Sequence, residues 1–166
     1  MFTGAHLTFD VSCCTEFVVP VKFETTWSTY VWDFVARKVF ILNPSMNNGD
    51  HSDKVVQSRH RAVARELHGA IGECIGTFFR GWEPNMSNWD PVFPKGLTSA
   101  VCESYNSGVY SLHFARHWMG AGLKKHLMPV GDAVAHSRMN LLVDSLSIKG
   151  NIGHVPAKYR ACIQPS

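Results

Sequence analysis

The side chains best suited to chemistry stand at the start of a predicted helix. A polar turn leads there directly into an apolar-periodic segment. The turn covers residues 103–108, and Asn106 and Ser107 stand at or beside the first helical position. Unpaired N–H groups and the macrodipole make this end of a helix favourable for negative charge, which would help an activated Ser107 oxygen. Ser and Asn also occupy such positions merely to cap the orphan N–H groups, and we favour that interpretation here.

Histidines are the candidate bases and metal ligands. A base must come within about 3 Å of a nucleophile or act through one water. His113 and His117 lie on the same helix as Ser107, roughly 9 Å and 15 Å further along its axis, so neither can reach it. Their i, i+4 spacing suits a metal, but no third ligand accompanies them, and we expect no metal site and no cofactor. Three other histidines could approach Ser107 through the fold, although no motif places them there: His6, His51 and His136.

Composition restricts the class of protein. A chain of 166 residues with 45% hydrophobic and 17% charged content predicts one globular domain over residues 1–166. The net charge of +3 comes without a dense basic stripe, which argues against a nucleic-acid partner. No apolar run is long enough to cross a bilayer, and residues 1–6 lack the features of a signal peptide. We therefore expect no membrane partner and an intracellular protein of the nucleus or cytoplasm.

The five cysteines are odd in number and lack paired spacing. This predicts reduced thiols rather than a disulfide framework. Cys13 and Cys14 are expected to be small buried side chains. Cys102 precedes the helix that begins near Ser107 and could be exposed, but nothing in the sequence supplies it with a catalytic partner.

Periodicity predicts an α+β fold. Residues 17–23, 27–34 and 37–42 are rich in β-branched and aromatic side chains and predict a meander, with Pro20 at an edge or bulge and residues 39–42 buried on both faces. A long helix follows from near Ser52, and Gly69, Gly72 and Gly76 suggest close approach of another backbone. Its apolar face would comprise Val56, Val63, Leu67, Ile71, Ile75 and Phe78.

The second half of the chain predicts an ordered loop and two further helices. Residues 80–98 form the loop, from which Trp82 and Trp89 would cover the sheet edge. The helix from Ser107 would point Val109, Leu112, Ala115 and Trp118 inward and end at residues 120–122. A last helix would span residues 133–146, and the tail at 149–166 is expected to fray.

Three motifs in chain order resemble a known family. Thr26-Trp27 opens one strand, Leu42-Asn43 ends a later one 17 positions after Thr26, and Asn106-Ser107-Gly-Val-Tyr110 starts a helix. This is similar to the catalytic domain of the ubiquitin-like-protein-specific (SUMO-type) cysteine proteases. In that family a His-Trp pair, a Leu-Asp pair and Asp-Cys-Gly-Val-Tyr hold these positions. The resemblance covers residues 17–120 and implies a papain-like, adenain-type fold with a short mixed sheet flanked by helices.

Every chemical position of that family is substituted. The family's His, Asp and Cys positions fall on Thr26, Asn43 and Ser107, and the Gln that forms the oxyanion hole falls on Val101. Thr26 cannot act as a base near neutral pH, and loss of triad members typically costs about 10⁴-fold or more in rate. Trp27 is kept, and the resemblance implies a role for it beside the tunnel for the substrate's C-terminal tail.

Three hypotheses follow from the resemblance. The first is a catalytically inactive homologue of a SUMO-processing peptidase, a pseudoenzyme that retains a surface for SUMO or another ubiquitin-like protein. The second is an active isopeptidase that uses Ser107 with an unrecognised base. The third is a decayed, transposon-derived product without activity, since the family domain normally has more chain before its first strand than residues 1–16 provide.

Overall fold

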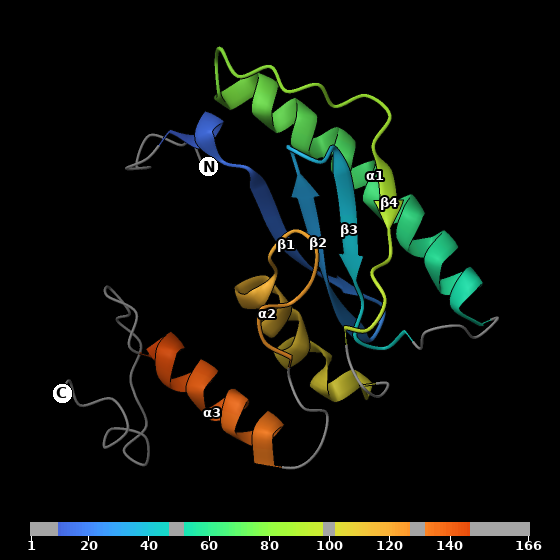
Figure 1. Ribbon diagram of the computed structural model, residues 1–166, viewed down its shortest axis with the longest axis vertical. Helices are drawn as coiled ribbons and strands as arrows, with labels where there is room; N and C mark the ends of the chain where they lie inside the picture. Colours follow the sequence, from blue (N-terminus) through green and yellow to red (C-terminus); the bar gives the residue numbers. More distant parts are fainter. Residues whose placement is uncertain (1–9, 47–51, 98–101, 127–131, 147–166) are drawn as a thin grey trace.

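The computed structural model describes residues 10–46, 52–97, 102–126 and 132–146 (Figure 1). Its strands are β1 (Glu16–Phe23), β2 (Thr26–Asp33), β3 (Lys38–Leu42) and β4 (Asp90–Val92). Its α-helices are α1 (Ser52–Phe78), α2 (Ser107–His117) and α3 (Asp132–Leu146), and short 3₁₀ turns, η1 and η2, span Val11–Cys13 and Ser104–Asn106. The predicted α+β class, with a short mixed sheet flanked by helices, is confirmed.

The four strands form one sheet in the order β1-β2-β3-β4. The first three pair antiparallel, as the predicted meander requires, and β1 lies at an edge, where Pro20 is tolerated. The fourth strand runs parallel to β3, with Val39 opposite Pro91. β4 lies within the predicted loop and has no sequence signal of its own, because three residues around a proline carry no alternating pattern.

Alternation along β2 divides the core between the two faces of the sheet. Tyr30 and Trp32 are fully buried in the cluster that includes Ala64 of α1. Val31 points the other way and packs with Tyr110 of α2. Successive side chains of a strand alternate in direction, so α1 and α2 cover opposite faces of the sheet (Figure 1). β3 is buried from both sides, as predicted.

The apolar stripe predicted for α1 meets the sheet. Val63, Leu67 and Ile71 pack against the cluster around Tyr30, and Ile75 is buried, whereas Phe78 at the helix end is 42% exposed. The expectation that the helix glycines admit a neighbouring backbone is wrong. A methyl group built at Gly72 would meet only the Met86 side chain at 4.0 Å, and the other two positions are open.

The inward face of α2 differs from the prediction. Leu112 is 42% exposed, while Tyr110 and Phe114 are buried with Val109. The i, i+4 pair of aromatic rings fills the space against the sheet, with ring centroids 6.1 Å apart, and this rotates Leu112 outward. Trp118 is buried as expected, although it follows the last helical residue.

Several smaller expectations are corrected. Cys13 is exposed and Cys14 half-buried, while Cys102 is buried rather than exposed. Trp82 packs against Phe17 of the edge strand β1, in line with its predicted place at a sheet edge, whereas Trp89 packs against Phe34 and the His68 ring of α1. Residues 149–166, where fraying was predicted, lie outside the described residues. Among the helices described, none is long and apolar enough to cross a membrane.

Candidate functional site

The start of α2 is joined to the start of β2 through the Ser107 side chain. Its Oγ accepts a hydrogen bond from the Trp27 backbone N–H at 2.9 Å and donates one to the Ser104 carbonyl at 2.5 Å. Ser107 is fully buried. Two of the motifs that carried the family resemblance, 80 residues apart in the chain, therefore meet in space.

These contacts define what Ser107 can do. A nucleophilic serine needs its O–H directed at a base and a free path to the substrate. The Ser107 O–H is instead directed at a carbonyl, its oxygen receives a backbone N–H, and no solvent reaches it. The arrangement suits a structural anchor between helix and strand.

The capping predicted for Asn106 and Ser107 is wrong. The Ser107 hydroxyl bonds to Trp27 and Ser104 and not to an N–H of α2. The Asn106 side chain makes no cap hydrogen bond to α2, because the preceding turn η2 already leads into the helix with Asn106 in helical conformation. The Asn106 Oδ1 instead accepts from the Arg138 guanidinium of α3 at 2.7 Å. Arg138 also donates to the Tyr105 carbonyl at 2.7 Å, so α3 is tied to the approach to α2.

A second polar contact joins α2 to β2 one helical turn further on. The Thr29 hydroxyl donates to the Ser111 carbonyl at 2.6 Å, and the two hydroxyl oxygens lie 2.8 Å apart. A hydroxyl has one proton, so the Ser111 hydroxyl donates to Thr29 Oγ1. Neither Thr29 nor Ser111 was among the predicted site residues. The available signal was the i, i+4 spacing of Ser107 and Ser111, which puts two small polar side chains on one helix face.

Thr26 and Asn43 lie on the other face of the sheet. Thr26 is paired with Phe23, whose ring contacts His60 of α1, and cross-strand partners share a face. The Thr26 hydroxyl donates to the Phe23 carbonyl at 3.3 Å. Asn43 also contacts His60. The structure thus brings Trp27 to Ser107 but directs Thr26 and Asn43 towards α1, and Val101 lies outside the described residues.

Asn43 belongs to a buried chain of hydrogen bonds. The Asn43 Oδ1 accepts from the Ser45 N–H at 2.8 Å, so its Nδ2 faces His60 Nε2 at 2.9 Å and donates to it. His60 therefore holds its proton on Nδ1, which donates to the Tyr30 hydroxyl oxygen at 2.5 Å. All three side chains are buried.

Burial lowers the pKa of His60 to about 4, against a small opposing effect of Glu24. Protonation of His60 Nε2 would also place its N–H against the N–H of the Asn43 amide, so that two donors face each other. This too disfavours the charged ring. Burial raises the pKa of Tyr30 well above its ordinary value. His60 and Tyr30 are therefore both uncharged at physiological pH. The enclosed position of this hydrogen-bond network suits a specific core contact rather than catalysis.

Cys102 is not an activated thiol. It is 5% exposed, and its Sγ donates to the Glu103 carbonyl at 3.1 Å. Burial, with the nearby Glu103 carboxylate, raises the pKa of the thiol to about 11. Reactive cysteines have a lowered pKa and some exposure, so Cys102 is expected to react slowly.

The histidine pair of α2 stands beside a basic segment. The His113 and His117 rings are 4.4 Å apart between centroids, and His113 Nε2 donates to the Lys125 carbonyl at 2.8 Å. No group of three or more His, Cys, Asp or Glu side chains is arranged for a metal ion within residues 10–46, 52–97, 102–126 and 132–146.

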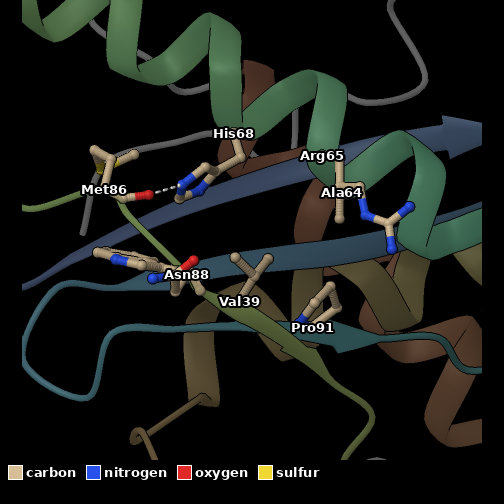
Figure 2. A pocket seen from close by; sticks show the side chains of 8 residues that line it. Val39, Ala64, Arg65, His68, Met86, Asn88 and Pro91 are labelled. Carbon is tan, nitrogen blue, oxygen red and sulfur yellow. Dashed lines mark hydrogen bonds between the residues drawn. The ribbon is translucent and has the colours of Figure 1, made fainter.

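A small cavity of about 170 Å³ lies between α1 and the segment that precedes β4. Figure 2 shows His68 of α1 reaching across it to the Met86 carbonyl, 2.7 Å from Nε2. His68 Nδ1 accepts from the Trp32 indole N–H at 3.1 Å, so both ring nitrogens are used. His68 fixes the segment to the helix and has no ring nitrogen left for a ligand.

Aromatic side chains at the start of α2 are partly open to solvent. Trp27 is 39% exposed, and its indole lies against Gly108, where an added methyl group would come within 3.5 Å of the ring. Tyr105 is 69% exposed, with the Arg138 guanidinium 5.7 Å from its ring centre. An exposed indole held against a rigid helix start is the kind of feature that protein interfaces use as an anchor.

Comparison with protein-family models, with curated proteins and with solved structures yields no match to this chain.

Proposed function

We propose that this chain is a non-catalytic, protease-like domain that binds a ubiquitin-like protein such as SUMO. The observation that carries the proposal is the double hydrogen bonding and burial of Ser107. The residue in the nucleophile position of the resembled family serves here to hold α2 on β2. Without a catalytic role, this region functions by binding a partner protein at its exposed surface.

The positions of the other substituted residues support the lack of catalysis. Thr26 and Asn43 point towards α1, while Ser107 faces β2 from the side of α2. The histidine that contacts Asn43 is buried and uncharged, on the opposite face of the sheet from Ser107. These contacts give Ser107 no base, which argues against the alternative of an active serine isopeptidase.

Trp27 supports the binding half of the proposal. Its backbone N–H is held by Ser107 and its ring lies against Gly108, and this contact restricts the side chain before a partner covers it. Aromatic anchors of this kind account for a large share of interface energies. The C-terminal tail of a ubiquitin-like protein is the partner that the resemblance implies.

Isothermal titration of the chain with a panel of ubiquitin-like proteins tests the proposal. We expect saturable heat with at least one, and a loss of affinity of about tenfold or more for Trp27→Ala. Val35→Ala is the matched control, because Val35 is 77% exposed just beyond the other end of β2. Absence of heat with every panel member would remove the binding function, and equal losses in the two variants would remove Trp27 from it.

A further inference from the structure

A cleft between α2 and α3 gathers positive charge. It has a volume of about 230 Å³, and the cationic Arg116 and Lys125 line it beside the imidazole rings of His113 and His117. Ser137 and Asn140 of α3 add a hydroxyl and an amide opposite them. No Asp or Glu is among the lining residues that the structure describes. The cleft is separate from the surface around Trp27 that the proposed function uses.

The charge of the cleft is only partly neutralised by its surroundings. Arg116 donates to the Asp144 carboxylate of α3 at 2.6 Å, in a pair that is about half exposed on each side. One guanidinium nitrogen is used in this contact, and a guanidinium has five N–H donors. Lys125 is exposed, and its backbone carbonyl rather than its amine is used by His113.

His113 is half-buried in this positive environment. His113 donates through Nε2 to the Lys125 carbonyl, so its Nδ1 is the nitrogen left to titrate. The pKa of His113 is lowered first by burial and then by the charges of His117, Lys125 and His126, while the bond to the Lys125 carbonyl opposes the decrease. From α3 the cleft receives uncharged Ser137 and Asn140, and the Asp144 carboxylate stays with Arg116. A bound anion would therefore favour protonation of these rings.

The cleft also has an apolar side. Val109 of α2 is 8% exposed, and Leu141 of α3 is half-buried against the core around Phe114. Both line the cleft next to the cationic groups. A ligand that satisfies both parts needs a compact anion joined to a small organic group.

We propose that this cleft binds a phosphate monoester, with Arg116, His117 and Lys125 on the phosphate group and Val109 and Leu141 against the organic group. A phosphate dianion offers three terminal oxygens to the Arg116 guanidinium, the Lys125 ammonium group and the His117 imidazole, and the planar arginine fork pairs well with it. A carboxylate has one charge and two oxygens, which leaves part of this set unused.

Histidine Cε1–H signals, followed by NMR over a pH series, test this site. Phenyl phosphate is the probe, inorganic phosphate the comparison, and sodium chloride keeps the ionic strength constant. We expect phenyl phosphate to raise the pKa of His113 and His117 and to bind more tightly than inorganic phosphate. Lys125→Gln should weaken binding by about tenfold, whereas Lys124→Gln, the same charge change at the adjacent residue outside the lining, should have little effect.

Unchanged histidine signals with both probes would overturn the site. Equal weakening by Lys125→Gln and Lys124→Gln would also overturn it, because that result reports general positive potential and not a defined contact. Equal affinities for the two probes would overturn the ester and leave inorganic phosphate as the ligand.

Discussion

Ser107 Oγ lies 2.9 Å from the backbone nitrogen of Trp27 and accepts its hydrogen. This bond joins the first residue of α2 to the second residue of β2, and the partly exposed indole of Trp27 lies beside the helix start. A side chain in this role stabilises the fold directly. The following consequences can be measured.

Ser107→Ala should destabilise the chain. It removes the acceptor of the Trp27 N–H and the donor to the Ser104 carbonyl, and a buried group left unpaired costs about 1–3 kcal/mol. Urea unfolding followed by tryptophan fluorescence measures the change. Ser87→Ala, at an exposed turn position, is the control and should stay within about 0.5 kcal/mol of wild type. Equal stability of Ser107→Ala and wild type would contradict the anchoring role.

Thr29 and Ser111 should be energetically coupled. Thr29→Val keeps the shape of the side chain but removes the hydroxyl that donates to the Ser111 carbonyl, while Ser111→Ala removes the second hydroxyl. Each change should cost about 1–2 kcal/mol, and a double-mutant cycle should give a coupling energy of about 1 kcal/mol. Additive effects of the two substitutions would show that the hydroxyls act independently.

The stability of the fold should fall as the pH decreases from about 6.5 to about 4. Above pH 6.5 His60 is neutral in both the folded and the unfolded chain; between these values only the unfolded chain takes up the proton, because burial lowers the folded pKa to about 4. The full loss from this residue is about 3 kcal/mol, and it levels off below pH 4. Urea midpoints at pH 7.5, 6.0 and 5.0 measure it. His136→Gln, which changes an exposed histidine, should keep the same pH dependence as wild type.

His60→Leu separates this contribution from those of other titrating groups. The variant should be less stable than wild type at pH 7.5, because the Asn43 amide and the Tyr30 hydroxyl lose their shared partner. Its urea midpoint should also change less between pH 7.5 and 5.0. A pH dependence as steep as that of wild type would place the titrating group elsewhere.

The sheet and α1 were predictable from sequence because their side chains repeat with clear periods. Tyr30, Val31 and Trp32 sit in a strongly β-forming segment, and the apolar stripe of α1 has to face it. β4 was not predictable, since a strand of three residues containing Pro91 is defined by its pairing with β3 and not by its own pattern. The direction of α2 was missed for a related reason: Tyr110 and Phe114 fill the core better than Leu112.

The candidate site was partly predictable. The order of the motifs along the chain singled out Trp27 and Ser107, and the two residues are joined by a hydrogen bond. The bonds that decide the role of Ser107 depend on tertiary geometry, as does the burial of His60 between Tyr30 and Asn43. A histidine on an amphipathic helix gives no sequence signal of the partner it will meet across a sheet.

The most direct measurement of the central claim is cleavage of a fluorogenic ubiquitin-like substrate by wild type and by Ser107→Ala. The protein concentration should be high. The temperature should be low enough for both proteins to remain folded, as monitored by circular dichroism. We predict the same background rate for both, because the Ser107 hydroxyl is held by Trp27 and Ser104. Cleavage by wild type that disappears in Ser107→Ala would contradict the claim and establish Ser107 as a nucleophile.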